Sequence, residues 1–158
     1  MDDNRLRDEL IGLLEGGHAH VSAQRAFSGL LPEHRMARAG DGGHTPWELL
    51  EHLRIAQEDI LRYVLEPSWR SPEWPEGYWP GPGAPSDEDW RGSLLAFERD
   101  LESLRDLVRD PGRDLTAPLP HSPKHTVLRE VLLVADHNAY HLGQVVEVRR
   151  RLGDWERG

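Results

Sequence analysis

Proline and glycine divide this chain into helix-forming stretches and connections, and no other feature of the sequence restricts its fold as strongly. Apolar residues recur at helical spacing in four stretches, whereas most of the prolines and glycines lie between those stretches. The pattern predicts an all-α protein. Because 158 residues suit one compact domain, we expect residues 1–158 to form a single helical bundle around one core.

The clearest helix start in the sequence follows Thr45. Its hydroxyl can cap the helix, Pro46 suits the first helical position, where a missing N–H costs nothing, and Glu48 completes a capping box. Apolar residues then recur at helical spacing until shortly before Pro67. We therefore expect a helix over residues 46–65.

Three further helices are expected on similar signals. Ser86 and the acidic residues after it predict a helix over about 86–108, because a capping hydroxyl and negative charge suit a helix N-terminus. The longest pattern covers about 126–152 and ends at a glycine that follows three arginines. A weaker helix is expected over 3–15, and a short one over about 22–30.

The connection over residues 66–85 is too rich in proline to be a helix or a central strand. An extended chain covers about 3.3 Å per residue, so this segment is long enough to run the full length of a bundle. The helices before and after it can therefore point in the same direction. Its aromatic residues must be buried somewhere, and we expect them to pack on the bundle as a lid: Trp69, Trp74, Tyr78 and Trp79.

Charge and composition exclude several classes of function. The chain has 19 basic and 28 acidic residues, a formal charge of −9, which argues against nucleic acid as a partner. No apolar run approaches the roughly 20 residues that span a bilayer, so no membrane role is expected. The acidic first residues do not resemble a secretion signal, so we expect a cytoplasmic protein. Cysteine is absent, so the chain has no thiolate ligand and no cysteine nucleophile.

Two of the nine histidines, His121 and His125, are four residues apart on either side of Pro123. A proline and the residue before it disfavour the helix that would align the two rings. We interpret this pair as part of a surface loop.

A second pair with the same spacing, His137 and His141, lies inside the apolar pattern of the last helix, where residues four apart share a face. Gln144 extends the same polar stripe. Buried polar groups need partners, and either a hydrogen-bonded network with water or a bound cation would satisfy these three. His52 lies at the border of the apolar face of the 46–65 helix. One histidine from one helix and two from a facing helix predict a metal site inside a bundle.

Three protein ligands leave a coordination position for water or substrate, as in catalytic metal sites. The sequence after His137 lacks the glutamate that zinc proteases use as general base, and the helices of the three histidines lack the Glu-x-x-His pairs of di-iron bundles. Three imidazoles suit zinc best, and nickel, copper and iron(II) are also admissible. The sequence therefore predicts a divalent-metal site without an encoded catalytic nucleophile.

The order of these features resembles the DinB/YfiT-like metal-binding four-helix bundles. The resemblance rests on the segment from Thr45 to Leu53, the long connection, and the block from Asp136 to Gln144, and it spans nearly the whole chain. It implies an up-down-down-up bundle, often dimeric, with a divalent ion held by the three histidines. Some such proteins are metal-dependent transferases or isomerases that use a small thiol such as bacillithiol, mycothiol or glutathione.

We expect a small-molecule substrate, with a low-molecular-weight thiol as cosubstrate and a metal-dependent transferase reaction. A metal-dependent hydrolase and a non-catalytic metal-binding or dimerisation module remain alternatives. Five residues are candidates for contacts with the ligands or the substrate. Tyr140 lies between the paired histidines and Gln144 follows them. Glu48 and Asp59 share the helix of His52, four residues before it and seven after it. His20 follows a glycine break.

Overall fold

The computed structural model describes residues 3–155, which are mostly helical. Within this range there are five α-helices: α1 (Asp3–Glu15), α2 (Ala23–Phe27), α3 (Pro46–Leu65), α4 (Asp87–Arg109) and α5 (Val127–Arg151). Two short 3-10 helices cover Pro32–His34 and Glu76–Tyr78. These elements confirm the predicted helical class. None of the described helices is long and apolar enough to cross a membrane.

Side-chain caps fix the starts of the long helices where the sequence predicts them. The Thr45 hydroxyl accepts from the backbone N–H of Glu48, and the Glu48 carboxylate accepts from the backbone N–H of Thr45, which completes the capping box of α3. Ser86 and Asp89 form the same reciprocal pair at the start of α4. Thr126 caps α5 through the backbone N–H of Arg129.

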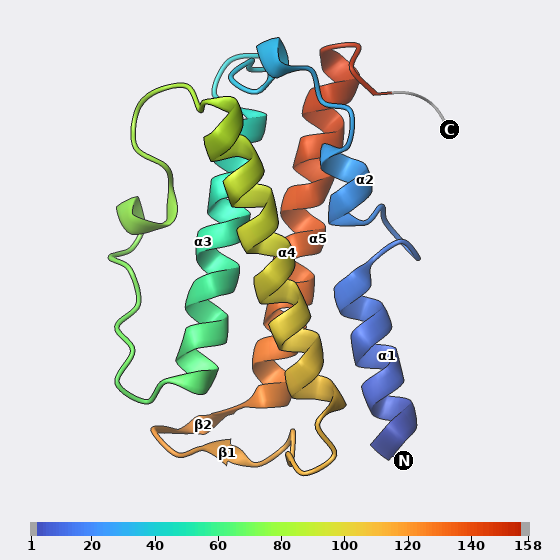
Figure 1. The fold of residues 1–158 in the computed structure, drawn as a ribbon, viewed down its shortest axis with the longest axis vertical. Coiled ribbons are helices and arrows are strands. Elements are labelled where there is room, and N and C mark those ends of the chain that lie inside the picture. The colour runs from blue at the N-terminus through green and yellow to red at the C-terminus, as the bar shows by residue number, and fades with distance from the viewer. Residues whose placement is uncertain (1–2, 156–158) are drawn as a thin grey trace.

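The long connection between α3 and α4 crosses the length of the molecule. Figure 1 shows α3 running downward, the connection returning upward beside it, and α4 running downward again, while α1 and α5 run upward. α3 packs against both α4 and α5, and α1 packs against the same two helices. The connection therefore makes α3 and α4 parallel, as its length predicts.

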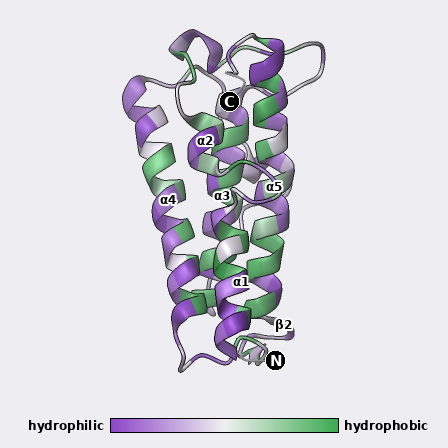
Figure 2. Cartoon of the chain, turned by 90° about the vertical axis from the view of Figure 1, so that its right-hand side faces the viewer, coloured by the Kyte–Doolittle hydropathy of each residue, from purple (hydrophilic) through white to green (hydrophobic). Residues whose placement is uncertain are grey.

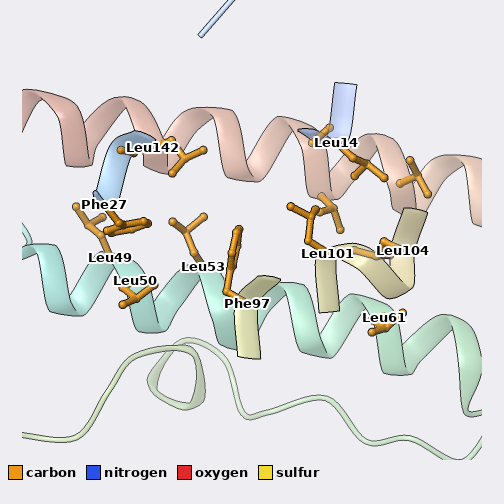
Figure 3. Packing of buried hydrophobic residues seen from close by; sticks show 14 of the residues in the cluster. Leu14, Phe27, Leu49, Leu50, Leu53, Leu61, Phe97, Leu101, Leu104 and Leu142 are labelled. Atoms are coloured by element: carbon orange, nitrogen blue, oxygen red, sulfur yellow. The ribbon is translucent and has the colours of Figure 1, made fainter. Parts of the chain in front are cut away.

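Apolar side chains from all these helices meet in one core. The hydrophobic faces turn inward and the polar faces outward (Figure 2). Figure 3 shows Leu53 of α3, Phe97 of α4 and Leu142 of α5 in this core, and all three are almost fully buried. Phe27 from α2 joins them at the same level. Burial of these faces is what stabilises the helices, since in proteins most helical stability comes from the packing of an amphipathic face.

A small antiparallel hairpin precedes α5 and corrects the prediction of a surface loop at His121 and His125. Its strands are β1 (Pro118–Leu119) and β2 (Ser122–Thr126). Both histidine rings pack against Tyr63 at the lower end of α3, and the Tyr63 hydroxyl lies 2.9 Å from Nδ1 of His125. Pro123 excludes a helix as expected, but it is tolerated in β2 because a two-stranded sheet has only edge strands.

Candidate metal centre

Three imidazole rings from two helices converge in the upper half of the molecule. His52 comes from α3, and His137 and His141 come from successive turns of α5. The Nε2 atom of His52 lies 3.0 Å from Nε2 of His137 and 3.1 Å from Nε2 of His141. His52 and His141 are buried, and His137 is half-buried. These are the three histidines that the sequence predicts to meet, and together they can hold one metal ion.

Hydrogen bonds at the outer ring nitrogens define the protonation of two of these rings. Nδ1 of His52 lies 2.9 Å from the backbone oxygen of Tyr78, which can only accept, so this nitrogen carries the proton. Nδ1 of His141 lies 2.7 Å from Oε1 of Gln144 and donates to it in the same way. In the neutral rings, both Nε2 atoms therefore present lone pairs to the centre of the site.

The surroundings keep all three rings neutral. Burial is the main cause that lowers the pKa of His52 and of His141 below that of a free imidazole. Burial, together with the nearby His141 and His52, lowers the pKa of His137 to about 4. Neutral imidazole is the form that binds metal ions, so the site is in its binding form at neutral pH.

The connection between α3 and α4 closes over the site and supplies the partner of His52. The ring of Trp79 stacks on His52 at 4.1 Å between centroids, and His44 stacks on the opposite face of Trp79 at the same distance. Trp79 and the carbonyl of Tyr78 thus hold the His52 ring from its face and from its edge. The predicted packing of Trp79 and Tyr78 on the bundle is confirmed, whereas Trp74 is 72% exposed and does not pack there.

Asp59 ties this connection to α3. Its carboxylate accepts one hydrogen bond from the Trp69 indole and one from the Tyr78 hydroxyl, each 2.7 Å long. Burial and the hydrogen bond to Asp59 raise the pKa of Tyr78 to about 12, so the phenol remains a donor. Asp59 is buried and does not contact the imidazoles directly. It acts on His52 through the segment that carries Tyr78 and Trp79.

The other predicted candidates differ in their distance from the site. Gln144 holds His141, and the ring of Tyr140 makes an edge contact with that histidine, although Tyr140 is 67% exposed. Glu48 takes part in the capping box of α3 and pairs with Arg38, and its carboxylate also lies 3.5 Å from Nδ1 of His44. His20 lies 2.8 Å from the backbone oxygen of Val21, apart from the three rings.

Sequence reasoning misses His44, Trp79 and the Tyr78 carbonyl as parts of the site. His44 directly precedes the cap of α3, and nothing in its local pattern indicates a partner far along the chain. A backbone carbonyl leaves no side-chain signal at all. The only sequence signal for this shell is the concentration of aromatic residues in 66–85.

A family model of the DinB superfamily matches residues 6–145, most of the chain and the part that contains all three converging histidines. The chain belongs to the DinB superfamily. This membership confirms the resemblance stated from the sequence. Comparisons with curated proteins and with solved structures return no match. What the site of this DinB-superfamily protein can bind is therefore inferred from the geometry of its own residues.

Proposed function

We propose that this DinB-superfamily protein holds a divalent metal ion on His52, His137 and His141, and that it transfers a small-molecule thiol to an electrophilic substrate. One observation carries the metal assignment. The Nε2 atoms of His52 and His141 are both hydrogen-bond acceptors, yet they lie 3.1 Å apart. Two acceptors cannot bond to each other, and a cation shared between their lone pairs turns this repulsion into attraction.

The donor set suits zinc. Three neutral nitrogen ligands and one open position are typical of catalytic zinc sites. When bound there, a divalent cation supplies Lewis acidity, which lowers the pKa of a coordinated thiol or water to near neutrality. The chain itself contributes the orientation of the rings: the Tyr78 carbonyl fixes His52, and Gln144 fixes His141.

The thiol must come from a second molecule, because the chain contains no cysteine. The resemblance to thiol-using transferases supports this choice over water as the attacking group. In the proposed reaction, the thiolate sulfur forms a bond to an electrophilic carbon, the leaving group departs with its bonding pair, and the thiol proton passes to solvent.

The arrangement of the helices supports the bundle type that the family resemblance implies. We assign α1, α3, α4 and α5 to the four positions of an up-down-down-up bundle, with the long connection between the second and third. In this arrangement α3 and α5 are neighbours, which places His52 opposite the paired histidines of α5.

Metal content tests the first part of the proposal. Untagged protein is dialysed against Zn²⁺, and bound zinc is measured by mass spectrometry for the wild type and for His52→Ala, His137→Ala and His141→Ala. His18→Ala is the matched control, because His18 is exposed and lies outside the site. We expect stoichiometric zinc in the wild type and the control, and loss in the other three. Unchanged zinc in those three variants would overturn the metal assignment.

Turnover tests the second part. The zinc-loaded protein is incubated with an activated aryl chloride in the presence and absence of a small thiol, and the products are separated. We expect a thioether product that requires protein, zinc and thiol together. Formation of the hydroxylated product with equal rate in the absence of thiol would replace the transferase by a hydrolase, and no product in either case would favour a binding module.

A further inference from the structure

The outer nitrogens of the three converging rings are not equally provided with partners. Nδ1 of His52 and Nδ1 of His141 each donate to an oxygen acceptor. His137 turns its Nε2 towards His52 at 3.0 Å, and no residue in 3–155 lies at hydrogen-bond distance from its Nδ1. A histidine that binds a metal through one nitrogen almost always donates its other N–H, so His137 needs an acceptor of its own.

A short chain of amide groups runs through the core and ends at the residue after His137. The Nε2 group of Gln57 on α3 donates to the backbone oxygen of Phe97 on α4 at 2.7 Å. Because a backbone oxygen can only accept, the Gln57 amide is fixed with Oε1 on its other side, where it accepts from Nδ2 of Asn138 on α5 at 3.0 Å. The orientation of the Asn138 amide is fixed in turn, and its Oδ1 forms the free end of the chain.

Oδ1 of Asn138 is buried without a partner in the described part of the chain. Asn138 is 6% exposed and Gln57 is 1% exposed, so bulk water does not supply a donor. Nearly all buried polar atoms in proteins have a partner, because an unpaired acceptor costs free energy. Two apolar residues would fill the same space without that cost. The two amides therefore call for a reason, and Oδ1 calls for a donor.

Asn138 acts on the ring of His137, which precedes it in α5. Burial lowers the pKa of His137 most, whereas the interaction with the Asn138 side chain raises it. An amide raises the pKa of an imidazole when its oxygen faces a ring N–H, because an acceptor favours the protonated ring. The Nδ2 group of Asn138 is already bound to Gln57, which leaves its oxygen for this role. The unpaired acceptor thus lies near the one ligand ring that lacks an acceptor.

We propose that Asn138 is the outer partner of His137, and that Nδ1–H of His137 donates to Oδ1 of Asn138 when a metal ion is bound. Asn138 is then a positioning residue, which keeps the proton on Nδ1 and the lone pair of Nε2 directed at the ion. Gln57 and the Phe97 carbonyl hold the amide in place and so connect the site to α4. The inference rests on the proposed function, because it needs a metal ion at the three histidines.

The first measurement uses the wild-type protein with isotope-labelled histidine, loaded with Zn²⁺. NMR assigns each ring N–H through bonds to the ring carbons and measures how fast its proton exchanges with water. We expect a slowly exchanging proton on Nδ1 of His137, as on Nδ1 of His52 and of His141. A His137 proton that exchanges as fast as that of free imidazole would overturn the inference, and this result needs no variant.

Two matched variants separate positioning from packing, since each replaces one buried amide of the same chain by leucine. Asn138→Leu removes the acceptor, so it should weaken zinc binding by about 10- to 100-fold and abolish the slow exchange at His137 alone. Gln57→Leu leaves Oδ1 of Asn138 in place. It should weaken zinc binding less and retain the slow exchange at His137.

The outcomes distinguish this inference from the proposed function. Wild-type zinc affinity and wild-type exchange at His137 in Asn138→Leu would overturn the positioning role and leave the metal site intact. Equal losses of affinity and of slow exchange in Asn138→Leu and Gln57→Leu would assign both amides to packing and would also overturn it. Failure of the wild type to bind Zn²⁺ would instead overturn the proposed function, and this inference with it.

Discussion

Replacing Asp59 by asparagine should weaken metal binding, although Asp59 touches none of the three imidazoles. Asparagine keeps the shape of the side chain but offers one acceptor oxygen where the carboxylate serves both Trp69 and Tyr78. One of the two donors then faces an amide N–H₂ group in a buried position. A hydrogen bond to a charged group contributes about 1.5–3 kcal/mol, so the free energy of unfolding should fall by about 2 kcal/mol.

The same substitution loosens the segment that holds His52. Tyr78 supplies the carbonyl that accepts from Nδ1 of His52, and Trp79 covers the ring. Loss of such an outer partner typically weakens metal binding by about 10- to 100-fold, and we expect the lower end of this range because the carbonyl remains in the chain. Zinc affinity is measured by competition with a chromophoric chelator, and stability by urea unfolding of the metal-free protein.

Arg7→Met is the control for a merely structural effect. Arg7 is buried at the opposite end of the molecule, where its guanidinium donates to the backbone oxygens of Val108, Asp110 and Arg113. Its loss should lower stability by a comparable amount and leave zinc affinity unchanged. If both variants weakened zinc binding equally, or if Asp59→Asn destabilised the protein without any loss of affinity, the proposed connection from Asp59 to His52 would be wrong.

Three further predictions follow from individual residues. The metal-free protein should lose stability as the pH falls from 6.5 towards about 4, because the pKa of His137 is lowered in the folded state and the unfolded chain takes up the proton first; melting temperatures across this range should fall less steeply for His137→Gln. Glu48→Ala should cost about 1 kcal/mol through loss of the capping box, with zinc content unchanged in the same preparation. Gly143→Ala should raise the melting temperature, since its Cβ meets no neighbour and alanine favours helix by about 1 kcal/mol.

The helices of this protein are predictable because their signals are local. The capping residues Thr45, Ser86 and Thr126 all act within one turn, and the structure begins the three long helices directly after them. The convergence of the histidines is also accessible, because His137 and His141 share a helix face and a third ring is available on a long helix elsewhere. These histidines can be recognised in the sequence because the helical backbone fixes which residues share a face.

The surroundings of the histidines are less predictable because they depend on contacts between distant segments. Spacing places Asp59 on the same helix face as His52, which suggests direct contact, but the carboxylate instead holds Trp69 and Tyr78. Glu48 lies on the same helix face, four residues before His52, but its carboxylate forms the helix cap, pairs with Arg38 and lies 3.5 Å from Nδ1 of His44. The path of an irregular connection decides between such roles, and proline-rich segments have no periodicity from which a path can be read.

Diffraction from crystals grown with Zn²⁺, recorded at the zinc absorption edge, tests the central claim most directly. We predict one anomalous peak about 2.0–2.1 Å from Nε2 of each of the three histidines, the usual distance for zinc and imidazole nitrogen. A peak elsewhere, for example between His121 and His125, or density showing a water molecule alone among the three rings, would contradict the account.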